Sequence, residues 1–263
     1  MPNEQHLTLT YYGHCSFMWQ TARGVKVIAD PYRNQKDFYW FTRKFPKVDC
    51  DLALVTHAHF DHDAVNRLPE AASVLRMPGY FQLEDMSIRG VLDWHSGQWT
   101  SEQLLDEAPR MTPKQILDRH FALANIPNVM FLLEANGIRF LHIGDNRADW
   151  PAEVRQAIGQ VDVLMVTVDD SCHLLSYQQV NRLIGQLRPR VVVPMHYQIP
   201  GLNPPTVTLD PPDRWLSTQP DVRRIESHKV TIGPGDLPHE TQVWLFEPSP
   251  ASLAAPTVEP EEI

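Results

Sequence analysis

The sequence lacks the features that mark a nucleic-acid-binding or a disulfide-rich protein. Its 263 residues carry 23 Lys and Arg against 32 Asp and Glu, which gives a net charge of −9. A chain that neutralises a phosphate backbone needs clustered cations, so we expect no nucleic-acid partner. The three cysteines, Cys15, Cys50 and Cys172, form no CxxC pair. This favours reduced thiols and a cytoplasmic location over a disulfide framework.

Long hydrophobic runs are also missing. No stretch approaches the roughly 18 uninterrupted apolar residues of a membrane-spanning helix, and the polar start, Met1–Gln5, has no signal-peptide pattern. We therefore expect no membrane contact and a small molecule as the partner. The apolar fraction is nevertheless 43%, which is enough to bury a sizeable core.

Short apolar runs that end at polar or turn signals predict the strands of a buried sheet. Asn136-Gly137 is a hairpin signal between two of them. Pro151–Arg155 has the signals of a helix start, and Tyr177–Leu187 places apolar residues at helical spacing. Strands that first meander and then alternate with helices indicate an α/β fold with a mixed sheet or two packed sheets. The predicted strands are Leu7–Tyr11, Ser16–Trp19, Val25–Ala29, Asp51–Thr56, Met86–Leu92, Asn128–Leu133, Ile138–Ile143, Val161–Val168 and Arg190–Pro194.

The domain organisation is expected to be simple. Residues 1–247 are predicted to form a single domain. Within it, residues 96–125 carry helical patches outside the strand pattern and are interpreted as a lid-like insertion. Residues 248–263 are rich in Pro, Ala and Glu and are predicted to be a disordered tail.

The chemistry-bearing motif is His57-Ala58-His59-Phe60-Asp61-His62, directly after the apolar run that ends at Thr56. In extended backbone, residues two apart point the same way, so His57, His59 and Asp61 can converge while His62 points to a neighbouring place. Imidazole and carboxylate are ligands for zinc and similar metals. Four ligands in one motif, with others expected elsewhere, favour two metal ions over one.

Further metal-competent residues follow other strand-like runs. Asp145 comes after the run 138–144, His196 after the run 191–195, and His95 after the run 88–94. Because the ends of neighbouring strands meet at one rim of a sheet, we expect these residues to join the 57–62 motif.

Several segments together carry a resemblance to a known family. The segments are Thr56–His62, His142–Arg147, Pro194–Tyr197, Gly13–Phe17 and Ile28–Tyr32. Together they resemble the metallo-β-lactamase superfamily, over roughly residues 7–200. More narrowly, they are similar to its ascorbate-6-phosphate-lactonase-like branch, which also resembles N-acylphosphatidylethanolamine phospholipase D. The resemblance implies an αββα sandwich of two mixed β-sheets flanked by helices, with two metal ions at one edge.

The resemblance also implies a role for each matched residue. Asp145 would bridge both metals, Asp30 would orient a ligand histidine, and His14 would lie near the metal rim. The first metal would be held by His57, His59 and His95, and the second by Asp61, His62 and His196. Zinc or manganese fits best, with iron as a third option.

Some assignments stay open. His120 is an alternative to His95 as the third histidine; we favour His95 because it ends a strand, whereas His120 ends a helical patch of the insertion. In that case His120 is a pocket residue contributed by the lid, or a surface histidine. Asp169 and Asp170, with His173, either shape the substrate pocket or serve a turn or helix cap. The aromatic residues at 11–12 and 38–41 form either core or a pocket wall, with core favoured.

The predicted activity is metal-dependent hydrolysis. A metal-activated hydroxide would attack the ester or lactone carbonyl of a small metabolite, phosphorylated or not, with Asp61 orienting the nucleophile. One alternative is a phosphodiesterase with the same site. Alternatives of other classes are an iron-dependent redox enzyme on the same fold and a catalytically silent binding protein. The sequence is compatible with a homo-oligomer and does not fix the substrate.

Overall fold

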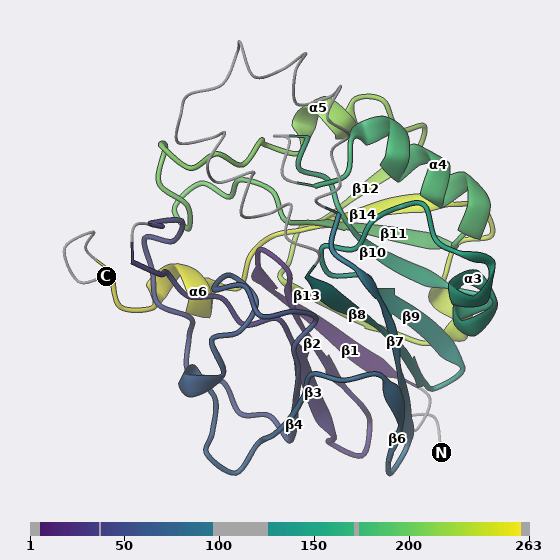
Figure 1. Ribbon diagram of the computed structural model, residues 1–263, viewed down its shortest axis with the longest axis horizontal. Coiled ribbons are helices and arrows are strands. Elements are labelled where there is room, and N and C mark those ends of the chain that lie inside the picture. Colours follow the sequence, from purple (N-terminus) through teal and green to yellow (C-terminus); the bar gives the residue numbers. More distant parts are fainter. Residues whose placement is uncertain (1–5, 37, 97–125, 171–173, 259–263) are drawn as a thin grey trace.

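The computed structural model describes residues 6–36, 38–96, 126–170 and 174–258. Within them, two mixed β-sheets pack face to face, with helices α3 and α4 along the outer side of the larger sheet (Figure 1). This confirms the predicted αββα sandwich of two mixed sheets. The predicted insertion, residues 97–125, lies outside the described residues. No helix among the described segments is long and apolar enough to cross a membrane.

The smaller sheet has six strands in the order β13-β1-β2-β3-β4-β5, and the larger has eight in the order β12-β14-β11-β10-β9-β8-β7-β6. The strands of the smaller sheet are β1 (Leu7–Gly13), β2 (Ser16–Gln20), β3 (Lys26–Ala29), β4 (Leu52–Leu54), β5 (Ser73–Leu75) and β13 (Lys229–Ile232). Those of the larger sheet are β6 (Gly79–Leu83), β7 (Met86–Trp94), β8 (Pro127–Ala135), β9 (Ile138–His142), β10 (Val163–Thr167), β11 (Val191–Met195), β12 (Val222–Ile225) and β14 (Gln242–Phe246).

Parallel and antiparallel pairing both occur in each sheet. β1, β2 and β3 form an antiparallel meander, and β4 then runs parallel to β3. In the larger sheet, β10 lies parallel to both β9 and β11. Every residue of β10 and β11 is buried, as expected for parallel strands covered on both faces. All nine predicted strands are present.

The helices follow local sequence signals. They are α3 (Ala152–Ile158), α4 (Tyr177–Leu187), α5 (Asp213–Leu216) and α6 (Pro250–Ala254), with 3-10 turns at Val65–Arg67 and Pro234–Asp236. α4 begins with a capping box in which the Ser176 hydroxyl accepts from the backbone of Gln179, and the Gln179 side chain accepts from the backbone of Ser176. Its buried face carries Val180 and Leu183, which is the face that the apolar spacing predicts.

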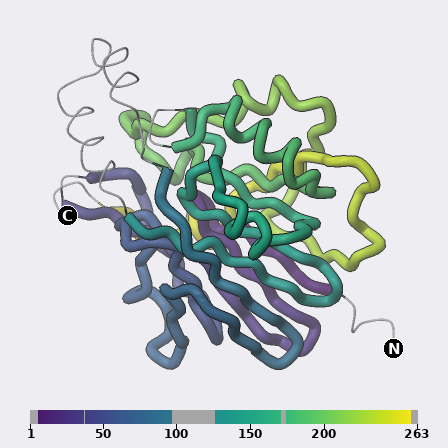
Figure 2. The backbone as a smooth tube through the Cα atoms, turned by 45° about the vertical axis from the view of Figure 1, so that its right-hand side comes forward, coloured from purple at the N-terminus to yellow at the C-terminus, as the bar shows by residue number. Residues whose placement is uncertain are grey.

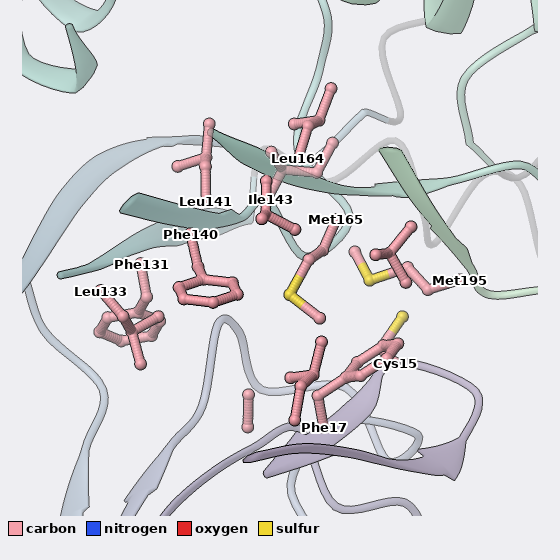
Figure 3. Packing of buried hydrophobic residues seen from close by; sticks show 14 of the residues in the cluster. Cys15, Phe17, Phe131, Leu133, Phe140, Leu141, Ile143, Leu164, Met165 and Met195 are labelled. Atoms are coloured by element: carbon pink, nitrogen blue, oxygen red, sulfur yellow. The ribbon is translucent and has the colours of Figure 1, made fainter. Parts of the chain in front are cut away.

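Side chains from both sheets meet in one hydrophobic core. Figure 3 shows Phe131, Phe140 and Met165 of the larger sheet facing Phe17 of β2. Figure 2 shows the same two layers from another side, with the purple strands β1 and β2 against the teal strands β8 and β9. The Asn136-Gly137 turn joins β8 to β9 with φ of +52° and +73°, the positive values that such hairpin turns require.

The predicted disordered tail needs correction for residues 248–258. Ser249 caps α6, accepting from the backbone of Ala251, and Pro250 is its first residue. Serine before proline is a helix-start signal that the tail's composition obscures. The Ser249 amide donates to Tyr11, and the Val258 amide donates to Thr42. The chain therefore stays attached to the sandwich up to residue 258.

Candidate metal centre

Strands from both sheets deliver polar residues to one rim of the sandwich, each within three residues of the end of its strand. Because β9, β10 and β11 run parallel, as do β3 and β4, their carboxyl ends point the same way. The residues that follow these strands are Asp30, His57, Asp145, Asp169 and His196, and those that follow β1 and β7 are His14 and His95.

The first cluster consists of His57, His59, His95 and Asp145, whose ligand atoms all lie within 4.8 Å of one another. Asp145 Oδ2 is 3.4 Å from His95 Nε2 and 3.8 Å from His57 Nε2. His59 is the most exposed member, and the other three are buried. The geometry therefore groups His95 with the two motif histidines, while the alternative, His120, lies outside the described residues.

The second cluster consists of His14, Asp61, His62 and His196, all buried and again within 4.8 Å of one another. Asp61 Oδ2 is 3.0 Å from His14 Nε2 and 3.4 Å from the Nε2 atoms of both His62 and His196. Sequence reasoning placed His14 only near the rim. The structure places it inside the cluster, because the positive φ of His14 (+56°) after Gly13 turns the chain at the end of β1.

Asp145 lies between the two clusters. Its Oδ2 atom is within 3.4 Å of His95 on one side, and 3.3 Å from His62 and 3.5 Å from His196 on the other. A single carboxylate in contact with both histidine sets is the arrangement that a bridging ligand requires.

Asp30 holds the motif from behind. It is fully buried, with φ of +45°, and its carboxylate accepts from the Thr56 amide and hydroxyl, both at 2.8 Å. The same carboxylate lies 2.8 Å from His62 Nδ1. This contact fixes the imidazole so that Nε2 faces the second cluster, as expected for the residue behind a metal ligand.

Asp169 has the same relation to His196, at a longer distance. Its Oδ2 lies 3.6 Å from His196 Nδ1, and its Oδ1 accepts from the Asp210 amide. Asp170 instead accepts from the Tyr177 amide at the start of α4. Asp170 thus serves the turn before α4, one of the roles that the sequence left open, whereas Asp169 lies behind a ligand histidine, a role that the sequence analysis did not consider. His173 lies outside the described residues.

Burial and charge set the protonation of the centre. Burial lowers the pKa of His57 well below its usual value and the pKa of His59 and His14 to about 4. Burial alone would raise the pKa of Asp61, but nearby His62 and the hydrogen bonds from His14 and His196 hold it well below its usual value. At pH 7 these three imidazoles are therefore neutral and the Asp61 carboxylate is ionised, which are the protonation states in which both groups can ligate a metal.

Several atoms of these histidines and carboxylates have no hydrogen-bond partner within the part of the protein that the structure describes. Among the described residues, the buried atoms His62 Nε2, His95 Nδ1 and Nε2, and Asp145 Oδ1 have no hydrogen-bond partner. An unsatisfied buried polar atom costs about 1–3 kcal/mol, and these atoms belong to converging imidazoles and carboxylates. The residues therefore fit divalent cations, which such groups ligate.

Gly144 sets how closely the Asp145 turn approaches the motif. Its φ is +56°, and an added Cβ would lie 2.6 Å from the Thr56 side chain. We expect Gly144→Ala to destabilise the fold by about 3 kcal/mol through overpacking and backbone strain. The free energy of unfolding in urea measures this. Gly185→Ala in α4, where nothing lies within 4 Å, is the control and should stabilise by about 0.5–1 kcal/mol; equal effects of the two changes would contradict the packing argument.

Comparison with known proteins places the chain in a family. The model of the beta-lactamase superfamily domain matches residues 8–196, a range that holds the described members of both clusters. The chain belongs to this superfamily. This confirms the family predicted from the sequence; no comparison singles out the lactonase-like branch.

Two relatives and one solved structure illustrate the membership. A UPF0173 metal-dependent hydrolase from Opitutus terrae is 28% identical over 214 residues, covering 78% of this chain and 89% of the relative. A UPF0173 protein from Pyrococcus abyssi is 27% identical over 195 residues, covering 73% and 83%. A crystal structure from Thermotoga maritima, described as a candidate Zn-dependent hydrolase, aligns with a TM-score of 0.62 at 21% identity, covering 92% and 98%. The name of the Opitutus terrae relative agrees with the enzyme class predicted from the sequence.

Proposed function

We propose that the chain is a dinuclear metal-dependent hydrolase that cleaves an ester or lactone bond of a small molecule. The observation that carries this proposal is the pair of buried His/Asp clusters that share Asp145. In the first cluster, the metal would be held by His57, His59 and His95. In the second cluster, the metal would be held by Asp61, His62 and His196, with His14 as a further ligand. Metal-dependent hydrolase is also the name that relatives of this chain carry.

The chemistry of the donors favours zinc. The two clusters contribute six imidazoles but only two carboxylates, and imidazole suits zinc and iron, whereas manganese prefers oxygen ligands. When bound, a pair of such ions lowers the pKa of a shared water toward neutrality and offsets negative charge that develops on the substrate. Zinc is therefore proposed as the metal, ahead of manganese and iron.

Asp61 is proposed to orient the nucleophile. Its three short contacts with imidazoles all use Oδ2, so Oδ1 can accept a hydrogen bond from the attacking water. This bond would aim a lone pair of the water oxygen at the carbonyl carbon. His59, the most exposed imidazole, marks the side from which substrate would approach.

The charged residues beside the centre favour a carbonyl over a phosphoryl substrate. Arg33, whose amide donates to Phe60, pairs with Asp63 at 2.9 Å. Arg147, two residues after Asp145, pairs with Asp93 at 2.7 Å. Both guanidinium groups are thus already neutralised by carboxylates. A phosphodiester would gain little from them, whereas an ester or lactone needs no such cation.

Elemental analysis paired with a substrate panel tests the proposal. The panel contains 4-nitrophenyl acetate, alkyl lactones and bis-4-nitrophenyl phosphate. Oxygen uptake is measured in a separate assay. We expect about two zinc ions per chain and hydrolysis of esters or lactones. Turnover of the phosphodiester alone would instead make this a phosphodiesterase. One iron per chain with oxygen consumption would make it a redox enzyme.

A substitution at Asp30 tests the support behind His62. Asp30→Asn keeps the shape of the side chain but replaces one carboxylate oxygen that faces His62 Nδ1 and Thr56. We expect metal affinity to fall by about 10–100-fold, as for other residues that orient ligands, measured by competition with a chromogenic chelator. The control is Asp49→Asn, whose side chain is 82% exposed and pairs with Lys26. If Asp30→Asn left the metal affinity unchanged, Asp30 would have no role in positioning the metal ligands.

A further inference from the structure

Three aromatic side chains stand beside the second cluster and outside its ligand set. Phe38, Trp40 and Phe60 form a continuous aromatic wall, with ring centroids 5.5 Å apart for Phe38 and Phe60 and 5.4 Å for Trp40 and Phe60. All three are half-buried. Neighbouring Phe41, in contrast, is fully buried and packs on Tyr32. Each of the three residues therefore keeps part of its surface accessible.

The wall touches the centre directly. The Trp40 ring lies 5.9 Å from the His196 ring and 6.2 Å from the His14 ring, with an edge contact to each. Phe60 lies between His59 and Asp61 in the motif itself. An apolar group packed on Trp40 would therefore lie beside the His196 and His14 rings of the second cluster.

Hydrogen bonds fix the loop that carries the wall. The Asn34 side chain accepts from the amides of Trp40 and Phe41 and donates to the Phe41 carbonyl. The Asn203 side chain donates to the Trp40 carbonyl, and the Thr42 amide donates to Leu202. A wall held in this way is formed before substrate binds, so little ordering entropy is lost on binding.

Charge near the wall argues for an apolar ligand. The cation that adjoins Phe60, Arg33, is paired with Asp63. Aromatic side chains that line a site beside a few fixed polar groups are typical of pockets for apolar ligands. A sugar phosphate would place several hydroxyl and phosphate oxygens against rings that offer one hydrogen-bond donor in all, the indole N–H of Trp40.

We propose that the aromatic wall binds an alkyl or aryl group next to the scissile carbonyl, so that the substrates are apolar esters or lactones and not phosphorylated sugars. This inference rests on the proposed hydrolase function. In the reaction, a water oxygen bonds to the carbonyl carbon, the carbon–oxygen ester bond breaks, and the leaving alkoxide takes up the proton that the water gives up, which yields a carboxylic acid and an alcohol. The wall takes no part in these steps; it sets which acyl groups reach them.

A series of 4-nitrophenyl esters from acetate to hexanoate tests the substrate class on zinc-loaded protein. Each added methylene should raise kcat/KM about threefold while it still contacts the wall. Phe38→Ala and Phe60→Ala should each lower the hexanoate-to-acetate ratio by about tenfold, with zinc content measured for every variant. The matched control is Tyr80→Ala on β6, a 71% exposed aromatic on an edge strand, which should leave the ratio unchanged.

A binding measurement separates this inference from the proposed function. Calorimetry compares hexanoate with acetate, the carboxylate products, on zinc-loaded protein and on Phe38→Ala. If hexanoate binds more tightly and Phe38→Ala removes the difference, the wall binds an alkyl group even where no ester is turned over, and it is the hydrolase proposal that fails, together with the ester or lactone bond assigned to the substrate. If esters are hydrolysed but the hexanoate-to-acetate ratio stays near one, or Phe38→Ala behaves like Tyr80→Ala, the wall inference is wrong and the hydrolase proposal survives.

Discussion

Asp145→Ala is expected to have the largest effect of any single substitution. Asp145 Oδ2 contacts histidines of both clusters, at 3.4 Å for His95 and 3.3 Å for His62. Its removal deletes the shared ligand and leaves imidazoles facing one another without the carboxylate charge. We expect bound metal to fall from about two ions to less than one per chain, and kcat to fall by at least about 10³-fold. Elemental analysis and ester hydrolysis on the same preparation measure both.

The nearby Asp149→Ala is the matched control for this result. Asp149 is exposed and lies four residues after Asp145, so the control makes the same change of residue type in the same segment of the chain but away from the clusters. It should change neither metal content nor turnover. If Asp145→Ala retained two metals and activity, Asp145 would not be a bridging ligand, and two separate mononuclear sites or a different centre would have to be considered.

Residues after strands could be predicted from the sequence because the chain has little freedom there. A buried strand with a parallel neighbour, such as β9 or β11, fixes the direction of its carboxyl end, and the next few residues cannot leave the rim. Asp145 and His196 lie where that argument places them. His95 follows from the same argument, since β7 ends one residue before it.

Residues placed by turns and long-range contacts could not be predicted in this way. His14 enters the second cluster through a positive φ, and no periodic pattern encodes that angle. Asp169 reaches His196 only because β10 and β11 are neighbours, which is a property of the sheet order and not of either segment. The two acidic residues that follow the strand indicated that Asp169 could have a functional role. Acidic residues are also common in turns, so this signal did not decide between the two roles.

The aromatic residues near the centre show the same limit. From the sequence, core packing was favoured over a pocket wall for all of them. Tyr11 and Phe41 are fully buried, whereas Phe38 and Trp40 are half-buried. The sequence alone does not distinguish buried rings from half-buried rings here, because in an irregular loop neighbouring residues point their rings in different directions without a regular period. The Asn34 hydrogen bonds that set this loop connect residues six and seven positions apart.

Removal of the metals is expected to abolish hydrolysis and to lower thermal stability strongly. A ligand present at 1,000 times its dissociation constant stabilises the native state by about 4 kcal/mol per site. Two sites would thus contribute about 8 kcal/mol, or a melting temperature lowered by roughly 15 °C or more in a chain of this size. Dialysis against a strong chelator, followed by calorimetry and an ester assay, measures both effects.

The metal-free chain should nevertheless remain folded. His62 and His196 lie 3.3 and 3.5 Å from Asp145 Oδ2, and despite their burial nearby carboxylates raise the pKa of both imidazoles, so their protonation can offset part of the lost cation charge. The hydrophobic core between the sheets lies apart from the rim and keeps its contacts. Zinc returned to this folded chain should therefore restore both the melting temperature and the activity. Full hydrolysis by protein shown to hold no metal would contradict the proposed function, because the chain's own imidazoles and carboxylates would then suffice.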